Sequence, residues 1–225
     1  MFSSVAETTT KSERTRALLR EVALRSFRER GYDATTIRRI AGEAGVSVGT
    51  TNYHFASKND LVQELYRDVQ DAHRASALPL LDGEADLIAR LRTAYRAGLD
   101  QLTPYHAHAA EFLSAAVSPR SPLNPLSSES AAALEITEEV FRAAVSGAEH
   151  RLPVEIADRL PRALVIGHLL LALFWVYDTS PGQRRTRSLL DRGLGLLRLA
   201  LPLARIPGLR TPVRELLDLV DEVRS

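Results

Sequence analysis

Residues 34–58, ATTIRRIAGEAGVSVGTTNYHFASK, decide the fold of this chain. The stretch predicts a helix over about 35–44, a turn at Gly45 and a second helix over about 47–54. The first helix is indicated by apolar residues at helical spacing, which are Ile37, Ile40, Ala41 and Ala44. A threonine hydroxyl at its start is suited to cap the first backbone N–H groups, and glycine tolerates the left-handed conformation that ends a helix.

The second helix of this pair is short and has almost no apolar stripe. After Ser47, which can cap it, it consists of small, hydrogen-bonding and aromatic residues: Val48, Gly49, Thr50, Thr51, Asn52, Tyr53 and His54. Such a helix adds little to a hydrophobic core. Small residues let a helix backbone approach the base edges of DNA, and polar ones reach bases and phosphates. We therefore expect a helix-turn-helix whose second helix enters a DNA groove.

The charge of the chain is unevenly distributed around this motif. Over all 225 residues the net charge is only +1. Residues 1–58 hold ten Lys and Arg against six Asp and Glu, whereas residues 59–225 hold nineteen against twenty-two. A positive excess beside the motif suits attraction to DNA phosphates, although a chance fluctuation of surface charge explains it equally well.

Long helical patterns separated by glycine and proline, without persistent strand alternation, predict an all-α fold. We expect a three-helix DNA-binding domain in residues 1–57, with a disordered N-terminal tail, and a larger helical ligand-binding and dimerisation domain in residues 58–225. A helix over 58–77 would connect the two, and the pattern breaks near Pro79. The other helices are expected at about 12–30, ending at Gly31, and at 84–102, 104–117, 127–149, 153–179, 182–204 and 210–223.

Short motifs in the stretch 14–66 carry a family resemblance. They are Phe27-Arg28-Glu29-Arg30-Gly31-Tyr32, Thr35-Thr36-Ile37, Ile40-Ala41, Ala44-Gly45-Val46-Ser47, Gly49-Thr50, Tyr53-His54-Phe55, Ser57-Lys58 and Leu61. In residue type and spacing this stretch resembles the TetR family of bacterial transcriptional regulators. One departure is Thr51-Asn52, where many members have an apolar residue followed by Tyr.

The resemblance implies specific DNA contacts. The residues expected at the base edges are Val48, Gly49, Thr50 and Asn52. Those expected at phosphates, or at the helix start beside them, are Thr36, Ser47, Tyr53, His54 and Lys58. Arg38 and Arg39 are either further contacts or part of a solvated helix face. Phe55 is expected to anchor the second helix in the domain core.

The resemblance also implies a homodimer that binds a double-stranded DNA operator. A recognition helix that reads a few base pairs needs duplication for useful specificity, which predicts a near-palindromic operator. The apolar helices at 153–179 and 182–204 are the expected interface, as a four-helix bundle across the two-fold axis. The interface residues that we expect are Leu170, Phe174, Leu190, Leu194, Leu197 and Leu201.

The resemblance places a small-ligand site in the C-terminal domain, and we expect the cavity among the helices between 84 and 179. Aromatic side chains together with a few polar groups suit the binding of an apolar or aromatic organic effector. The candidate lining residues are Tyr95, Leu99, His106, Phe112, Phe141, His168 and Trp175, with ordinary core packing as the alternative for each. The loop 118–130, with three prolines and five serines, is either a lid over this cavity or a plain surface loop.

The sequence favours a cytoplasmic regulator over an enzyme, a metalloprotein or a membrane protein. It has no cysteine and none of the common phosphate-loop, hydrolase or zinc-protease motifs, so we expect no cofactor and no metal. The longest apolar run, 163–177, is too short for a membrane span and predicts a helix buried all round. We expect a repressor released by its effector. Control by a protein partner without a small ligand, or activation instead of repression, stays open.

Overall fold

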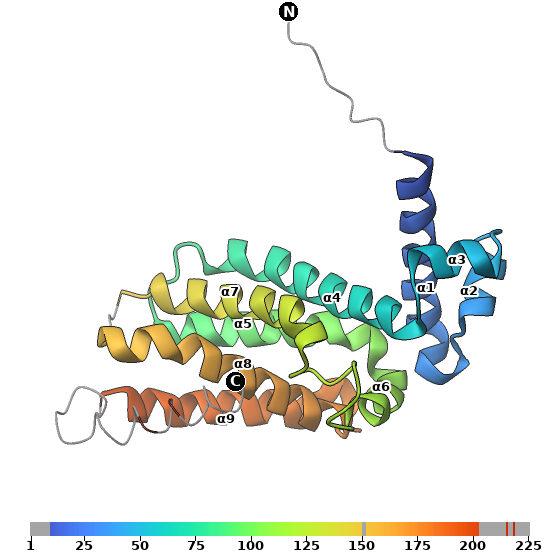
Figure 1. Ribbon diagram of the computed structural model, residues 1–225. Helices are drawn as coiled ribbons and strands as arrows, with labels where there is room; N and C mark the ends of the chain where they lie inside the picture. Colours follow the sequence, from blue (N-terminus) through green and yellow to red (C-terminus); the bar gives the residue numbers. More distant parts are fainter. Residues whose placement is uncertain (1–9, 150–151, 203–214, 216–217, 219–225) are drawn as a thin grey trace, which may run out of the picture.

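The computed structural model describes residues 10–149, 152–202, 215 and 218, and every regular element in them is a helix (Figure 1). The all-α prediction is confirmed. Helices α1–α3 lie at one end of the molecule, the larger bundle fills the other, and α4 runs from one into the other (Figure 1). The expected tail before Thr10, and all of the expected helix at 210–223 except residues 215 and 218, lie outside the described residues.

The N-terminal domain consists of α1 (Lys11–Ala34), α2 (Ile37–Glu43) and α3 (Val48–His54). A capping box starts α1, because the Thr10 hydroxyl accepts from Glu13 N and the Glu13 carboxylate accepts from Thr10 N. Gly31 interrupts α1 at the predicted position. Its φ of 78° and ψ of −173° are not helical, and a separate short helical segment follows as far as Ala34. The predicted core position of Phe55 is confirmed, together with Leu19, Val22, Phe27, Ile40 and Leu61.

Helix α4 (Lys58–Leu81) belongs to both domains. Leu61 lies in the core of the N-terminal domain, whereas Ala77 and Leu81 lie in the core of the larger domain. The predicted break near Pro79 is wrong. Pro79 is followed by only two more helical residues, so the hydrogen bond that its missing N–H removes belongs to the last turn, where it interrupts little.

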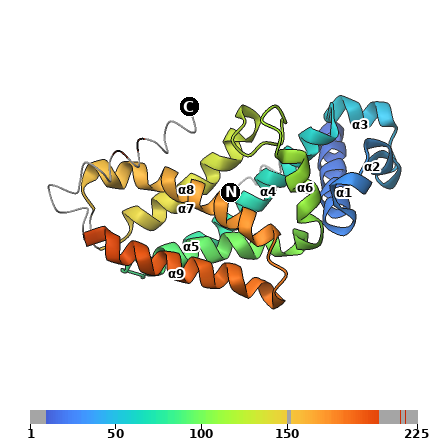
Figure 2. The same ribbon diagram turned by 90° about the horizontal axis from the view of Figure 1, so that it is seen from below.

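The larger domain is a bundle in which α5 and α7 pack against α4, and α8 and α9 lie outside them (Figure 2). Its elements are α5 (Leu87–Leu102), η1 (Thr103–His108), α6 (Ala109–Ala116), η2 (Ser128–Ser130), α7 (Ala131–Ser146), α8 (Val154–Val176), η3 (Pro181–Gln183) and α9 (Arg184–Ala200). The single helix predicted at 104–117 is a 3-10 turn and a short α-helix, because the backbone at His108 (φ −119°, ψ 6°) is not helical.

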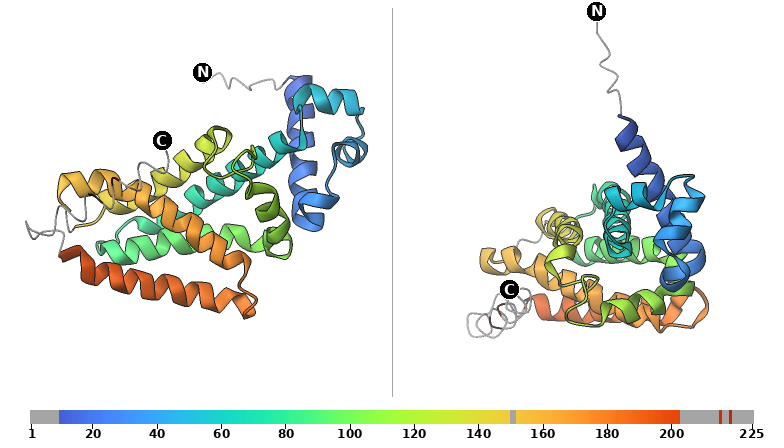
Figure 3. Two further views of the ribbon diagram at one scale, coloured as in Figure 1. Left: turned by 60° about the horizontal axis from the view of Figure 1, so that its bottom comes forward. Right: turned by 45° about the vertical axis from the view of Figure 1, so that its right-hand side comes forward.

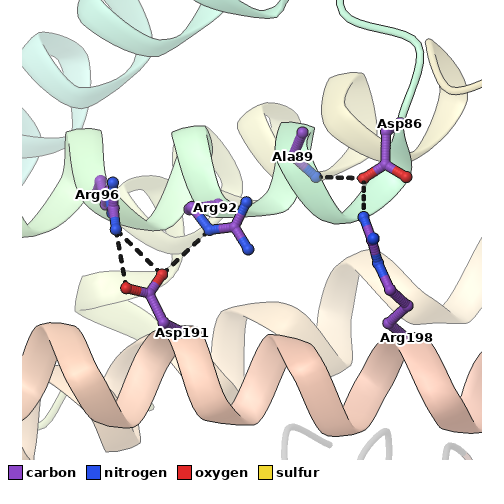
Figure 4. A network of polar contacts seen from close by, with 6 residues as sticks. All are labelled: Asp86, Ala89, Arg92, Arg96, Asp191 and Arg198. Carbon is purple, nitrogen blue, oxygen red and sulfur yellow. Dashed lines mark hydrogen bonds and ion pairs between the residues drawn. The ribbon is translucent and has the colours of Figure 1, made fainter.

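Ion pairs fix the rotation of α9 against α5 (Figure 4). The carboxylate of Asp191 lies 3.1 Å from Arg92 Nε and 2.9 Å from Arg96 Nη2, and Arg198 lies 2.7 Å from Asp86, the residue that caps α5. Exposed pairs of this kind contribute little to stability. They flank the face of α9 that meets the bundle, on which Leu190 and Leu194 are buried in the core.

Candidate DNA-binding surface and effector cavity

Helix α3 presents a polar face to solvent at the end of the molecule (Figure 1). Tyr53, on this face, is 81 % exposed. The other predicted DNA-contacting residues that are exposed are Thr36, Ser47, Val48, Gly49 and Asn52, and those that are half-buried are Thr50, His54 and Lys58. Thr51 is fully buried and turns inward, so it holds α3 on the domain.

Arg16 of α1 anchors the C-terminal end of α3, and the sequence pattern did not reveal it. Its Nη1 donates to the carbonyl oxygen of His54 at 2.9 Å, its Nη2 pairs with Glu64 of α4, and its guanidinium lies 4.4 Å from the centre of the Phe55 ring. A cation at a helix C-terminus also complements the helix dipole. Because these partners are 38 and 48 residues away in the chain, they leave no local signal.

The start of α3 leaves its backbone open to a partner. The Ser47 hydroxyl caps the helix by accepting from Thr50 N at 3.0 Å. A methyl group added at Gly49 would meet no atom closer than Ser47 Oγ, at 3.6 Å. The fold itself therefore does not require a glycine at this position, although glycine lowers helix stability. Close approach of an external molecule is a physical reason for it.

Thr36 and Lys58 are engaged within the protein. Thr36 caps α2 by accepting from Arg39 N at 3.2 Å. The Lys58 ammonium donates to the Tyr32 carbonyl oxygen at 3.0 Å and lies 3.6 Å from the centre of the Tyr32 ring, and partial burial lowers the pKa of Lys58. Lys58 must therefore leave Tyr32 to reach a phosphate. Arg38 and Arg39 are exposed and have no ion-pair partner among the described residues.

A cavity of about 390 Å³ lies in the larger domain between α4, α6, α7 and α8. Three of the predicted lining residues, Phe112, His168 and Trp175, form part of its wall. The loop 118–130 also contributes to the wall, through Asn124, Pro125 and Leu126. The loop is tied to α4, because Tyr66 donates to the carbonyl oxygen of Leu123 at 3.2 Å.

The other four predicted lining residues are corrected by the structure, because they pack outside the cavity. The Tyr95 hydroxyl donates to a backbone carbonyl of α8 at 2.9 Å, and Leu99 and Phe141 are sealed in the core. His106 lies against Trp175, with ring centroids 4.6 Å apart and Nε2 3.2 Å from the Trp175 carbonyl oxygen. Cavity walls and cores use the same residue types, so composition did not separate them.

The cavity touches both elements that support the N-terminal domain. Helix α4 lines it with Leu65, Tyr66, Val69 and Gln70, which the sequence did not single out as lining residues. Helix α6 carries Phe112, whose ring lies 5.7 Å from that of Phe27 and 5.9 Å from that of Tyr32. The neighbouring Glu111 carboxylate accepts from Asp33 N at 3.0 Å, at the junction of α1 and α2.

Two stacked histidines, His73 of α4 and His168 of α8, are buried beside the cavity. Their ring centroids are 5.6 Å apart and their planes are inclined by 17°. His73 Nε2 donates to the carbonyl oxygen of Ala94 at 2.8 Å. Burial lowers the pKa of both rings, and the neighbouring His73 lowers that of His168 further, to about 3. Both rings are therefore neutral at pH 7.

We expect the free energy of unfolding to fall as the pH drops below about 6.5, the pKa of histidine in an unfolded chain. The unfolded chain binds a proton at His168 in this range, whereas the folded protein does so only near pH 3. From pH 7 to pH 5 the loss from His168 is about 2 kcal/mol. Urea unfolding at pH 7 and pH 5 measures this loss. Between the two pH values, the free energy of unfolding of His168→Leu should fall by about 2 kcal/mol less than that of wild type. Equal losses in the two proteins would contradict the lowered pKa of His168.

Helices α8 and α9, which contact each other in the larger domain (Figure 3), leave exposed a set of large apolar side chains. We call it the α8–α9 apolar face, and its residues are Leu170, Leu173, Phe174, Tyr177, Leu189, Leu196 and Leu199. The prediction that α8 is buried all round is wrong, since only 39 % of its most apolar stretch is buried. By length and composition alone α8 also meets the criteria of a membrane span. Exposed apolar patches of this size mark interaction sites.

The predicted dimer residues divide between this face and the core of one protomer. Leu170 and Phe174 lie on the α8–α9 apolar face as expected. Leu190 and Leu194 are corrected, because they are 6 % and 4 % exposed and pack into the core. Leu197 and Leu201 are partly buried against the same core. On α9 the exposed positions are instead Leu189, Leu196 and Leu199.

A helix-turn-helix with an exposed second helix, joined by one helix to a larger helical domain with a cavity, is the architecture of a class of DNA-binding transcriptional regulators. Residues 19–65 match the model of bacterial regulatory proteins of the tetR family, and residues 90–223 match the model of the tetracyclin repressor-like C-terminal domain. The chain therefore belongs to the TetR family, and it is a regulator and not an enzyme.

Curated relatives match part of the chain. It is 38 % identical over 92 residues to the HTH-type transcriptional repressor KstR2 of Mycobacterium tuberculosis, over 41 % of this chain and 46 % of that protein. It is 39 % identical over 69 residues to the HTH-type transcriptional regulator TtgR of Pseudomonas putida, over 31 % of this chain and 33 % of that protein. The chain thus spans less than half the length of the curated relatives that it matches.

Solved structures share the fold over most of the chain. The TetR transcriptional regulator from Nitrosomonas europaea aligns with a TM-score of 0.59 at 19 % identity, over 80 % of this chain and 96 % of that one. Thermus thermophilus FadR, solved in complex with lauroyl-CoA, aligns with a TM-score of 0.59 at 21 % identity, over 80 % and 92 %. At these identities the similarity shows the fold alone.

Proposed function

We propose that this protein is a cytoplasmic repressor that binds a near-palindromic operator as a homodimer and is released by a small apolar effector. The observation that carries the proposal is the exposed polar face of α3, placed beside a helix, α4, whose middle turns line a cavity. Repression is proposed because the KstR2 relative is named a repressor.

Each α3 would enter a major groove with its N-terminal residues toward the bases. The residues proposed to face base edges are Val48, Gly49, Thr50 and Asn52. Those proposed to contact flanking phosphates or to position the helix start are Thr36, Ser47, Tyr53 and His54. Arg38 and Arg39 supply accessible cations, and Lys58 joins them only in a conformation in which its ammonium leaves Tyr32.

An effector in the cavity would act on DNA binding through α4 and α6. It would contact Leu65 and Val69 of α4, a helix that also carries Glu64, the partner of Arg16 at the end of α3. It would also contact Phe112 of α6, which packs on α1. Release requires the effector to bind more tightly to conformations in which the two α3 helices do not fit successive grooves.

The cavity supports control by a small molecule over control by a protein partner alone. The larger domain holds a partly open cavity of about 390 Å³, which is within the usual range of small-molecule sites, whereas control by a protein partner alone does not require such a cavity. Thermus thermophilus FadR, which shares this fold, was solved with lauroyl-CoA, so an apolar effector is compatible with the architecture.

We expect Gly49→Ala to raise the free energy of unfolding by roughly 0.5–1 kcal/mol, because alanine is the better helix former. The same change should weaken operator binding by at least about tenfold, because the methyl group stands between the α3 backbone and the bases. The operator is first obtained by selection from a random duplex pool. Fluorescence anisotropy then measures the affinity, and urea unfolding the stability.

Gly42→Ala is the matched control for this prediction. Gly42 is also an exposed helical glycine with open space around its α-carbon, but it lies in α2. It should gain similar stability and keep its affinity for the operator. If Gly49→Ala binds the selected operator as tightly as wild type, α3 is not the element that approaches the bases.

A further inference from the structure

Among the residues that the structure describes, those that line the cavity include no charged side chain. The lining residues are mostly aliphatic and aromatic, with a few amides and hydroxyls. An ionised group is costly to place in such surroundings without a counter-charge. The part of an effector that enters the cavity is therefore neutral.

Most polar groups of the wall already have partners within the protein. The Tyr66 hydroxyl donates to Leu123 O at 3.2 Å, and the Thr137 hydroxyl lies 2.9 Å from the Gln70 amide. Ser130 donates to the Asn124 carbonyl oxygen at 3.0 Å. The hydroxyl hydrogens of these groups are therefore already in use, and what they can still offer a ligand is mainly the acceptor capacity of their oxygens.

His168 differs from them. The residue is one of those that line the cavity, it is only 3 % exposed, and its Nδ1 is buried without a hydrogen-bond partner in the described part of the chain. Buried polar atoms are rarely left unpaired, because an unpaired one loses its hydrogen bond to water. The stacked His73 does not have this deficit, since its Nε2 donates to Ala94 O.

The His168 ring is also held in place. A methyl group on Gly98 of α5 would lie 2.6 Å from His168 Cε1, so only a glycine there gives the ring its room. On the other side the ring stacks on His73. A fixed, unpaired imidazole in an apolar wall is a pre-formed hydrogen-bonding point. The lowered pKa keeps the ring neutral, with one nitrogen donating and the other accepting.

We propose that the effector is a neutral, mainly hydrocarbon molecule with a hydroxyl group that hydrogen-bonds to the imidazole of His168. A hydroxyl both donates and accepts, so it can pair with either nitrogen in either tautomer, whereas a carbonyl oxygen only accepts. This assignment rests on the proposed function of the cavity as the effector site.

The test uses matched pairs of compounds that differ by one hydroxyl: adamantane and 1-adamantanol, cyclododecane and cyclododecanol, and decane and 1-decanol. Trp175, the one tryptophan of the chain, lines the cavity, so the fluorescence of the full-length protein reports binding directly. Dissociation constants are measured for wild type and His168→Phe. In the variant we expect the constant of each fitting alcohol to rise about tenfold, the effect of one lost hydrogen bond, and that of its hydrocarbon to change less than twofold.

Two further variants make the comparison decisive. Leu134→Met changes another buried wall residue of similar size without a hydrogen-bonding group, and it should leave the difference between alcohol and hydrocarbon unchanged. His168→Leu repeats the test in case a phenyl ring does not fit against Gly98.

The outcomes separate this inference from the proposed function. A loss of affinity confined to the alcohols supports the pairing with His168. Equal changes for alcohols and hydrocarbons, or no change, would overturn the pairing and leave the cavity as the effector site. If none of the compounds binds wild type, the cavity is not an apolar effector site and both proposals fail.

Discussion

Leu196→Glu is expected to convert the protein from dimer to monomer and to lower operator affinity by about 100-fold or more. Leu196 lies on the α8–α9 apolar face and is 69 % exposed. A two-fold interface repeats every substitution, so each dimer would have to bury two unpaired carboxylates. At a cost of about 3 kcal/mol or more the dimerisation constant falls by about two orders of magnitude.

Sedimentation velocity and operator titration measure the two effects of Leu196→Glu. Val117→Glu is the control, because Val117 is equally exposed at 67 % but follows α6, outside the α8–α9 apolar face. The control should remain a dimer with unchanged affinity. Because Leu196 is exposed in one protomer, circular dichroism of the variant should show a folded chain. A Leu196→Glu protein that remains a dimer would place the interface elsewhere.

Arg90→Met is expected to lower the free energy of unfolding by about 3–5 kcal/mol. Arg90 of α5 is buried and donates to four backbone carbonyl oxygens, those of Leu81, Glu84, Ala143 and Ala144, at 2.6–2.9 Å. Three of these carbonyls lie at the C-terminal ends of α4 and α7, where helical partners run out, and that of Glu84 lies just after α4. Backbone N–H groups also reach the oxygens of Leu81 (from Glu84 N, 3.4 Å) and Ala143 (from Gly147 N, 3.1 Å). Methionine keeps much of the volume but removes all four bonds from the guanidinium.

Arg96→Met, on the same helix, is the matched control for Arg90. Arg96 is exposed and pairs with Asp191, so its loss should cost less than about 1 kcal/mol. Gly147→Ala is a second way to remove the Arg90 hydrogen bonds, because a methyl group there would lie 2.1 Å from Arg90 Nη2 and displace the guanidinium. Urea unfolding followed by circular dichroism measures all three. Equal losses for Arg90→Met and Arg96→Met would contradict this role.

Features set by neighbouring residues were predictable from the sequence. The caps at Thr10, Ser47 and Ser57, and the bounds of α2 and α3, depend on contacts within a few positions of the chain. The helix-turn-helix motif also placed Phe55 in the core. These elements make up the helix-turn-helix, and so the class of protein followed from a short stretch of sequence.

Features set by packing between distant segments were not predictable. The sequence marked Lys58 as a phosphate contact, but not that its ammonium would find the Tyr32 carbonyl and ring 26 residues away. Apolar composition marked α8 and α9 as interface helices, yet it could not tell Leu190, which faces α5, from Leu189, which faces solvent. The four residues that were wrongly predicted to line the cavity illustrate the same point. The space left between helices depends on how all the helices of the domain pack together.

The central claim is that two copies of α3 dock side by side into one duplex. Hydroxyl-radical footprinting of the selected operator, with the number of bound chains determined by mass photometry, tests it most directly. The account predicts two chains per duplex and two symmetric protected regions whose centres are about 10 base pairs, or a multiple of that, apart. One chain on the duplex, or a single protected region without symmetry, would contradict it.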